Sequence, residues 1–508
     1  MDIKGQVKRQ ERRRLLTRDT DYSIAMMAIL GGLRGTVSYP YSICTQRSFP
    51  EDKTLRIIII GAGQVGFHIA SRLAMEKKDV VVVDKDPEAL RQVFESLDVQ
   101  TVQGCGSSPV ILEESGIKGA DILLAVTDSD ETNLVAAFFA SLLSPNTVKL
   151  ARIRGEEYLR YKEILMQEPY GIDVIINPEQ EAVKIIETLL RVPGAVDVGE
   201  FAEGRIKLVG VRLEDDSPVI GTELSDLGAK TGDLKVLVGA IVRNEKLIIP
   251  SGDNMLQKDD LVYFVSEEKD LKSALKMFGK RAEPFNRVLL IGGGNLGLKL
   301  AMTLEGMSIH TKLIEKNSDR CRELAEKLNK VVVLQGDGSD QDLLREENVQ
   351  NMDVVITLTD DEETNILAAL LAKRMGAHKT ITRINKFSYL PLAAVIGLEH
   401  VVSSRLAAIN TILHRIRRGK VLSAMALKGE EAEVLEAVAL ETSDIAGKPL
   451  KRISFPRNAL VVAIIRDQEV IIPTGDSVIS PDDRIIILST RQAIPQVEKA
   501  LMVKLEYF

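Results

Sequence analysis

The chain has 508 residues, 45% hydrophobic and 27% charged, which is typical of a globular protein of about three or four domains. Its 66 basic and 73 acidic residues leave a formal net charge of −7, so there is no general electrostatic attraction to nucleic acid or acidic lipid. Three scattered cysteines and five histidines without HxH or HxxxH spacing predict neither a disulfide framework nor a metal site. A reducing compartment is favoured.

Residues 1–54 differ from the rest of the chain. Seven basic residues between Lys4 and Arg18 precede an uncharged run of 12 residues, Tyr22–Leu33. This run is too short to span a bilayer, but a basic segment before a short apolar stretch resembles a secretory signal. The alternative is a poorly ordered leader, which we favour because no disulfide pattern follows. We expect the leader to be dispensable for folding and binding, or to reflect a misplaced start of the sequence.

The stretch Leu55–Gly66, LRIIIIGAGQVG, is a continuous apolar run that ends in a glycine-rich turn. Such a run predicts a strand of a parallel sheet that is buried on both faces. Gly61 permits the tight turn, Gly63 lets a pyrophosphate approach the backbone, and Gly66 lets the following helix pack closely. Asp84 ends the next apolar run, 23 residues after Gly61, where it can accept hydrogen bonds from a ribose. This spacing favours a dinucleotide or adenine-nucleotide site over a purely structural glycine turn.

Apolar segments and helical patterns alternate as far as Arg154, which predicts a doubly wound α/β lobe. The expected strands are 55–61, 79–84, 99–104, 121–127 and 147–153. Because ligands of such sheets bind at the carboxyl ends of the strands, Thr127, Asp128 and Arg152 should converge on the same crevice. Arg152 can present a fork of donors to phosphate oxygens, although a surface ion pair is the alternative. Residues 127–133 are also suited to capping the next helix.

The same pattern then recurs. Arg287–Ala301 repeats the strand, the glycine turn and the helix, and Glu315 lies 23 residues after Gly292. The segment QGCGSS at 103–108 is matched by QGDGSD at 335–340, and TDSDETN at 127–133 by TDDEETN at 359–365. The lobe is therefore duplicated.

A smaller α+β unit follows each lobe. Residues 201–278 are rich in short β-branched segments, and VGAIVRNEKLIIPSGD in this unit is matched by VVAIIRDQEVIIPTGD in the second half. Asn177 and Pro178 have the character of an N-cap and first residue of a helix that connects lobe and small unit. We expect the divisions 1–54 leader, 55–177 first lobe, 178–199 crossover helix, 200–280 small domain, 285–402 second lobe, 403–424 crossover helix and 425–508 small domain.

The first half contains GAGQVG, TDSDETN and ARIR, and the second half contains GGGNLG, TDDEETN and LAKRMGA. These motifs, in this order, resemble the TrkA family of potassium-uptake regulators. The resemblance covers residues 55–508. It implies Rossmann-like RCK (regulator of K⁺ conductance) lobes, each followed by an RCK C-terminal domain. It further implies a cytoplasmic protein, peripheral on the inner face of the plasma membrane, that binds NAD(H), ATP or ADP. Members assemble as rings, here expected as a homotetramer, beneath a membrane-embedded Trk potassium channel or transporter subunit.

The resemblance also assigns nucleotide contacts residue by residue. In the first lobe they would be Gly61, Ala62, Gly63, Gln64, Val65, Asp84, Thr127, Asp128 and Arg152. In the second lobe they would be Gly292, Gly293, Gly294, Asn295, Leu296 and Glu315. Cys105 departs from the pattern, because the family usually has Asp or His there and the second lobe keeps Asp337.

The motifs leave two other classes of function open. The main alternative is an NAD-dependent oxidoreductase with duplicated Rossmann domains, since the same fingerprint serves hydride transfer. That chemistry needs an acid or base beside the nicotinamide, and the small domains show no His/Asp or Lys/Tyr group for it. A DNA-binding redox repressor would need a helix-turn-helix and a basic face. We therefore expect no catalytic residues and no nucleic-acid partner, but a sensor whose nucleotide occupancy rearranges the ring and gates the pore.

Overall fold

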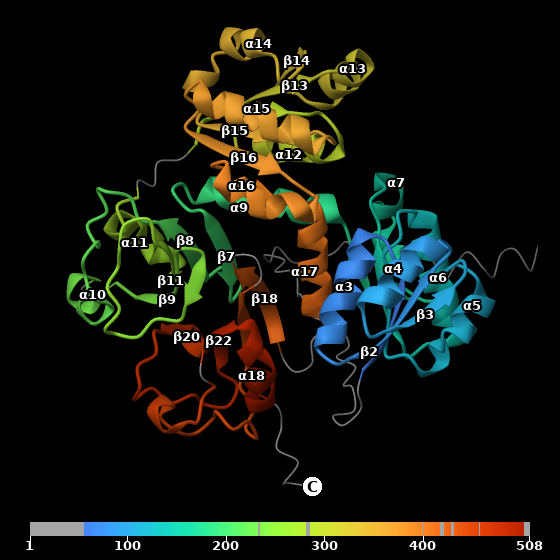
Figure 1. Cartoon of the computed structure of the whole chain (residues 1–508), viewed down its shortest axis with the longest axis horizontal. Helices are drawn as coiled ribbons and strands as arrows, with labels where there is room; N and C mark the ends of the chain where they lie inside the picture. Colours follow the sequence, from blue (N-terminus) through green and yellow to red (C-terminus); the bar gives the residue numbers. More distant parts are fainter. Residues whose placement is uncertain are drawn as a thin grey trace, which may run out of the picture. The chain divides into compact units, whose positions relative to one another are not determined.

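The computed structural model describes residues 55–231, 234–280, 285–398, 400–416, 421–427, 431–456 and 458–501. The leader expected over residues 1–54 lies outside the described residues. The described chain forms parallel-sheet lobes and smaller antiparallel-sheet domains in the order lobe, small domain, lobe, small domain (Figure 1). The predicted fold class is therefore confirmed.

The first lobe contains a six-stranded parallel sheet in the order β3-β2-β1-β4-β5-β6. Its strands are β1 (Arg56–Ile60), β2 (Asp79–Asp84), β3 (Gln100–Gln103), β4 (Ile122–Ala125), β5 (Val148–Arg152) and β6 (Val174–Ile176). Its helices are α3 (Gln64–Met75), α4 (Pro87–Ser96), α5 (Pro109–Glu114), α6 (Asp130–Leu143), α7 (Glu156–Leu159) and α8 (Lys162–Leu165). Residues 57–60 are at most 1% exposed, because α3 and α4 cover one face of the sheet and α5 and α6 the other. The strand order reverses between β1 and β4, which places a ligand crevice at the carboxyl end of β1.

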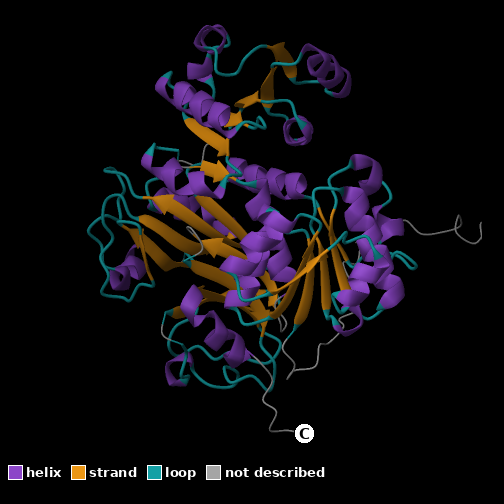
Figure 2. Cartoon of the chain, turned by 45° about the vertical axis from the view of Figure 1, so that its right-hand side comes forward, coloured by secondary structure: helices purple, strands orange, loops and turns teal. Residues whose placement is uncertain are grey.

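The second lobe repeats this topology in the order β14-β13-β12-β15-β16-β17. Its strands are β12 (Arg287–Ile291), β13 (His310–Glu315), β14 (Val332–Gln335), β15 (Val354–Thr357), β16 (Lys379–Arg383) and β17 (His400–Val402). Its helices are α12 (Asn295–Gly306), α13 (Ser318–Lys327), α14 (Gln341–Glu346), α15 (Glu362–Arg374) and α16 (Leu390–Val395). Figure 2 shows helices on both sides of the lobe strands.

There are two crossover helices, α9 (Pro178–Arg191) and α17 (Ser404–Ile416). Helix α9 packs into the core of the second lobe, and α17 packs into the core of the first lobe. Ile186 of α9 lies in the core of the second lobe with Leu300 of α12. Ile412 of α17 lies in the core of the first lobe with Ile69 of α3, and Figure 1 shows α17 beside α3. The buried residues of α9 recur every three or four positions, as expected for a helix with one apolar face. Neither lobe core is therefore complete without a helix from the other half.

Each small domain has a five-stranded sheet whose named strands pair antiparallel. The first sheet consists of β7 (Asp197–Phe201), β8 (Ile206–Arg212), β9 (Val236–Arg243), β10 (Lys246–Ile248) and β11 (Leu261–Glu267). The second consists of β18 (Val421–Leu427), β19 (Ala432–Val438), β20 (Ala459–Arg466), β21 (Glu469–Ile471) and β22 (Arg484–Thr490). The associated helices are α10 (Leu224–Thr231), α11 (Leu271–Met277) and α18 (Ile494–Leu501).

The two small domains share one apolar core. Tyr263 of β11 and Val462 of β20 belong to the same buried cluster, so the sheets face each other. A Cβ on Gly239 would lie 3.0 Å from Leu488 and 3.1 Å from Val462, so a side chain at this position would crowd the opposite sheet. On the far faces α11 covers the first sheet and α18 the second.

Candidate nucleotide sites at the glycine turns

The glycine turn of the first lobe leads from β1 into α3. Gly61 has φ +112°, which favours glycine, and a Cβ on Gly66 would lie 1.8 Å from the Gly61 carbonyl oxygen. At Gly63 no described heavy atom lies within 4 Å of where a Cβ would stand. Gly63 also occupies the N-cap of α3 without a side-chain cap, so the first N–H groups of α3 are available to an anion. The second lobe has the same arrangement at Gly294 and α12.

An acidic residue fastens each glycine turn. Asp84, at the end of β2, accepts hydrogen bonds from the Ala62 N–H at 2.6 Å and from the Asp86 N–H at 2.9 Å. Glu315, at the end of β13, accepts from the Gly293 N–H at 2.7 Å and from the Asn317 N–H at 2.8 Å. Each carboxylate oxygen retains a further lone pair, so a ribose hydroxyl can still donate to it.

Buried asparagines connect the ends of neighbouring strands. Asn133 is fully buried; its Oδ1 accepts from the Thr127 N–H and hydroxyl, and its Nδ2 donates to the Thr127 and Arg152 carbonyls. Asn365 makes the equivalent bonds in the second lobe. A different residue of the same segment, Ser129, is the N-cap of α6: its hydroxyl oxygen accepts a hydrogen bond from the Thr132 N–H at 3.1 Å. The TDSDETN segment thus caps a helix and also ties β4 to β5.

A cavity of about 720 Å³, the first cavity, opens at the end of β1. Its lining comprises Ile60, Gly61, Gly63, Gln64, Val65, Val83, Asp84, Lys85, Asp86, Ala89, Gly104, Cys105, Gly106, Val126, Thr127, Asp128, Ser129, Thr132, Arg152 and Arg405. Every residue predicted for the first lobe lines it except Ala62, which is buried behind the turn and donates to Asp84. The volume and the open glycine face suit a nucleotide.

A second cavity of about 270 Å³ lies at the glycine turn of the second lobe. It is lined by Arg154, Glu179, Gly294, Asn295, Leu296, Leu358, Asp360 and Arg383. Of the residues predicted for this lobe, Gly294, Asn295 and Leu296 line the cavity, whereas Gly292, Gly293 and Glu315 do not.

The difference between the cavities has a local cause. Arg320, five residues after Glu315, donates from Nε to the Gly293 carbonyl at 2.7 Å. In the first lobe the residue five positions after Asp84 is Ala89, which leaves this space to the first cavity. The longer Arg320 side chain therefore occupies a volume that is open in the first lobe.

The sequence patterns did not identify the residues that each half contributes to the cavity of the other half. Arg405 of α17 lines the first cavity, and Arg154 and Glu179 from the first half line the second cavity. The repeat could show that Glu179 and Arg405 occupy equivalent helix positions with opposite charges. It could not show that each helix lies against the other lobe.

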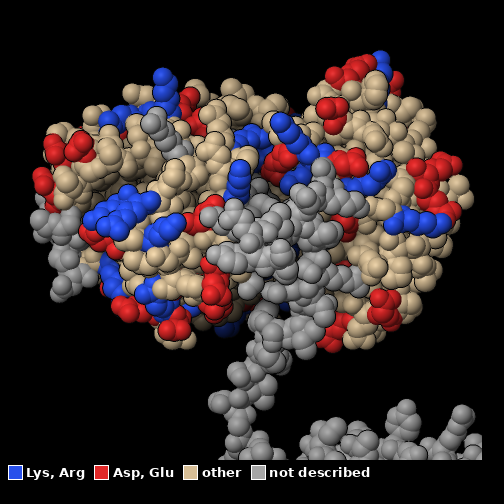
Figure 3. All heavy atoms as spheres, turned by 90° about the horizontal axis from the view of Figure 1, so that it is seen from below, with Lys and Arg blue, Asp and Glu red and all other residues tan. Residues whose placement is uncertain are grey.

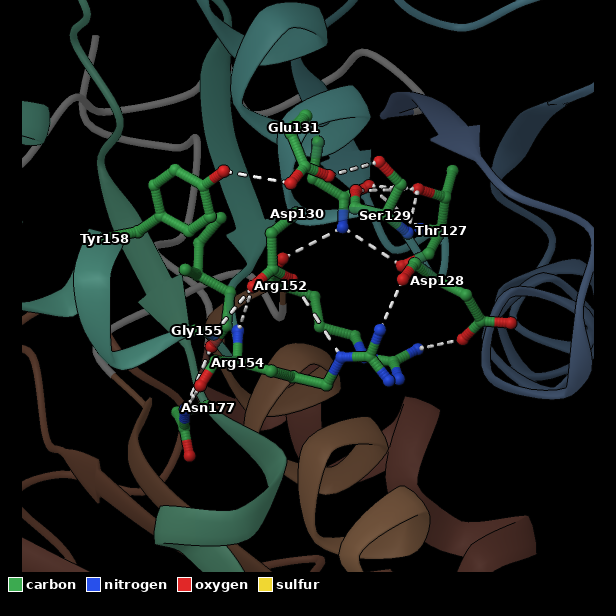
Figure 4. A network of polar contacts seen from close by, with 12 residues as sticks. Thr127, Asp128, Ser129, Asp130, Glu131, Arg152, Arg154, Gly155, Tyr158 and Asn177 are labelled. Atoms are coloured by element: carbon green, nitrogen blue, oxygen red, sulfur yellow. Dashed lines mark hydrogen bonds and ion pairs between the residues drawn. The ribbon is translucent and has the colours of Figure 1, made fainter. Parts of the chain in front are cut away.

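A polar network joins the neighbourhoods of the two cavities (Figure 4). Arg152 Nη1 lies 3.3 Å from an Asp128 carboxylate oxygen, and Arg154 donates to the Asp128 carbonyl. The Asp130 carboxylate accepts from the backbone N–H groups of Arg154 at 2.8 Å and Gly155 at 2.7 Å. Burial, followed by the nearby Arg154 charge, lowers the pKa of Arg152. The Arg152 guanidinium is only 11% exposed and its Nε has no hydrogen-bond partner among the described residues, so a ligand acceptor there would be favourable.

The third strand contributes different chemistry to the two lobes. Cys105 lines the first cavity, and its Sγ lies 3.1 Å from Ser107 Oγ. Hydrogen bonds from the Ser107 side chain and backbone lower the pKa of the Cys105 thiol. At the equivalent position, hydrogen bonds from Ser339 and Lys316 lower the pKa of Asp337 to about 2. The first lobe thus lacks the acceptor that Asp337 provides in the second.

Within the residues that the structure describes, no group of three or more His, Cys, Asp or Glu side chains is arranged to hold a metal ion. None of the described helices combines the length and apolar character needed to cross a bilayer.

The chain matches known domain families along most of its length. Residues 57–178 and 288–404 match the TrkA-N domain, and residues 208–279 and 434–502 match the TrkA-C domain. Among solved structures, the GsuK RCK domain has a TM-score of 0.56 at 18% identity and covers 89% of this chain and 96% of that chain. A GsuK channel bound to NAD has a TM-score of 0.56 at 17% identity, over 89% of this chain and 80% of that one. These structures share the fold.

Curated relatives are much more similar in sequence. The Trk system potassium uptake protein TrkA of Halomonas elongata is 37% identical over 458 residues, 89% of this chain and 100% of that protein. TrkA homolog 2 of Methanosarcina mazei is 38% identical over 453 residues, 88% of this chain and 99% of that protein. TrkA of Vibrio alginolyticus is 37% identical over 449 residues, 87% of this chain and 98% of that protein. The chain therefore belongs to the TrkA family of Trk-system potassium uptake proteins.

Proposed function

We propose that this chain is the nucleotide-sensing regulatory subunit of a Trk-type potassium uptake system. It binds NAD(H), ATP or ADP in its lobes, without reacting with the nucleotide. It acts at the cytoplasmic face of the membrane on a membrane-embedded Trk channel or transporter subunit. The observation that carries this proposal is the first cavity, in which an uncapped helix terminus, Asp84 and Arg152 surround one space.

Each of these groups suits one part of a nucleotide. The N–H groups at the start of α3 and the Arg152 guanidinium suit phosphate oxygens, and the Asp84 carboxylate suits a ribose. A nucleotide that binds one arrangement of the lobes better than another shifts the population between them, and no covalent step is needed. Because α17 completes the first lobe and continues into the second small domain, such a shift would reach both halves.

Binding and turnover should be measured together on the purified full chain. We expect NADH and ADP to bind in calorimetry, while the absorbance of reduced nicotinamide stays constant with candidate small substrates. Steady loss of that absorbance would instead support an oxidoreductase. In cells that lack the chromosomal copy, the chain should restore potassium uptake, and a variant defective in nucleotide binding should alter its control.

We also propose a homotetramer, with eight lobes in a ring. The supporting observation is apolar surface on equivalent helices: Leu142 of α6 is 55% exposed and Leu367 of α15 is 52% exposed. Light scattering at micromolar concentration should give the mass of four chains, and a monodisperse single chain would contradict the ring.

On the face drawn in Figure 3, basic and acidic side chains lie beside one another, so this face does not present a single sign of charge to nucleic acid.

A further inference from the structure

The second residue of each crossover helix reaches the cavity of the opposite half. In α17 this residue is Arg405, which lines the first cavity. In α9 it is Glu179, which lines the second cavity. Equivalent positions of the repeat therefore bring a positive charge to one candidate site and a negative charge to the other.

We propose that Arg405 and Glu179 set the number of phosphates that each cavity accepts. The first cavity takes ligands with a pyrophosphate or longer phosphate chain, such as a dinucleotide or a nucleoside diphosphate. The second cavity takes a nucleoside carrying at most one phosphate. This inference rests on the proposed nucleotide binding and adds to it that the two lobes of one chain recognise different ligands.

Arg405 is held over the start of α3, where phosphates would lie. Its backbone N–H donates to Asn385 Oδ1 at 3.5 Å, and its Nη1 donates to the Asn385 carbonyl at 3.4 Å and to Gln64 Oε1. Gln64 is the first residue of α3. The hydrogen bonds of the Arg405 guanidinium to the described residues are made through Nη1, so Nε and Nη2 can serve phosphate oxygens together with Arg152 and Lys85.

Glu179 has the opposite effect on the second cavity. Its Oε2 is buried and has no hydrogen-bond partner among the described residues. A carboxylate in this position repels a phosphate dianion, whereas a ligand hydroxyl or amide N–H can donate to it. The nearby Arg383 is already engaged by Asp360 at 2.8 Å and by the Thr359 carbonyl at 3.1 Å. Its Nη1 is therefore engaged within the protein, and its buried Nε has no partner among the described residues. Arg154, the other arginine of this lining, already donates to the Asp128 carbonyl.

The sizes of the cavities differ in the same sense as the charges of Arg405 and Glu179. The second cavity has about 270 Å³ against about 720 Å³ for the first, and Arg320, bound to the Gly293 carbonyl, stands at the position that Ala89 occupies in the first lobe. A dinucleotide would have to displace Arg320 from the Gly293 carbonyl. A mononucleotide or nucleoside requires less of this space.

Calorimetry on the full chain with ADP, AMP and adenosine tests the inference. Wild type should bind ADP once per chain. Arg405→Gln should weaken ADP binding about tenfold or more and leave adenosine binding unchanged, since the lost contact is charged and made to phosphate. Glu179→Gln should create a second ADP site per chain. Arg415→Gln and Glu181→Gln, with the same charge changes on the same helices, should behave as wild type.

The outcomes separate the inference from the proposed function. Equal ADP affinity in Arg405→Gln and wild type, a parallel loss of adenosine affinity, or unchanged ADP stoichiometry in Glu179→Gln would overturn the inference alone. Absence of any nucleotide binding by wild type would overturn both. Thermal melting of each variant, compared with its control on the same helix, distinguishes a loss of ligand contact from a loss of fold.

Discussion

At the scale of single residues, the carboxylate at the end of the second strand has two roles. Asp84 organises the glycine turn through the Ala62 N–H, and it faces the first cavity. A substitution therefore tests ligand recognition cleanly only if the turn is preserved. Asn preserves an acceptor oxygen and removes the charge, whereas Ala removes both.

Asp84→Ala should weaken NADH binding by about 1.5–3 kcal/mol, the usual contribution of a hydrogen bond to a charged group. Asp84→Asn should lose less NADH affinity but should bind NADPH more nearly as well as NADH, because the carboxylate no longer repels a 2′-phosphate. Calorimetry on the full chain measures both, with the exposed Asp98→Ala as control. Unchanged NADH affinity in Asp84→Ala would remove this residue from the site.

Asp197 should make the stability of the chain depend on pH. Burial raises the pKa of Asp197 in β7 to about 6, and the Tyr263 hydroxyl donates to it at 3.3 Å. The folded pKa is above the unfolded value, so its contribution to stability is present at low pH and is lost as the pH rises through about 6.

Asp197→Asn should therefore stabilise the chain at pH ~7.5, by at most about 3 kcal/mol, and have little effect near pH ~4. The Asn Oδ1 can still accept from Tyr263. Melting temperatures of variant and wild type across this range provide the measurement. A melting-temperature difference that does not change with pH would show that Asp197 titrates normally.

At the scale of elements, polar side chains lie at the carboxyl ends of the strands, and buried asparagines connect the ends of neighbouring strands by hydrogen bonds. Asn133 joins β4 to β5 with all its donors and acceptors engaged, and Asn365 joins β15 to β16. These contacts position Thr127 and Arg152 at the first cavity, so the packing of the sheet and the geometry of the candidate site depend on the same side chain.

Asn133→Ala should destabilise the first lobe by roughly 3 kcal/mol, because it leaves several buried backbone groups without partners. The exposed Asn146→Ala, in the loop after α6, is the matched control and should melt as wild type. Limited proteolysis of the two variants at increasing temperature compares them directly. Equal resistance to cleavage would show that these hydrogen bonds contribute little.

At the scale of the whole molecule, a buried ion pair links distant segments of the chain. Arg72 of α3 lies 2.5 Å from Glu433 of β19, with the two side chains only 6% and 3% exposed. The helix that starts at the first cavity therefore contacts the second small domain directly. The proposed response to a nucleotide would pass from the first lobe to that domain through this contact.

Arg72→Met should cost up to about 3–5 kcal/mol, because the buried Glu433 carboxylate would lose a charged partner at 2.5 Å. The double variant Arg72→Met/Glu433→Leu should recover most of that loss. For comparison, Arg91→Met breaks an exposed pair with Glu88 and should cost less than about 1 kcal/mol. Melting temperatures of these variants test the pair. A double variant no more stable than Arg72→Met would argue against charge burial as the cause.

Much of this protein could be predicted from the order of residues alone. The apolar runs, the glycine turns and the acidic residues 23 positions later are local patterns, and local patterns determine which segments become strands and where the lobe cavities open. Repetition of these patterns also showed the duplication. The short strand β6, three residues long, carried too little pattern to be predicted.

The tertiary structure alone decided how the two halves combine. Helices α9 and α17 have one apolar face each, and a face of that kind does not specify which lobe will cover it. Their exchange between halves brings Arg405 to the first cavity and Glu179 to the second. It also explains why equivalent helix positions bring opposite charges to the cavities of two similar lobes. Contacts between residues hundreds of positions apart depend on packing in three dimensions, and no local pattern in the sequence records them.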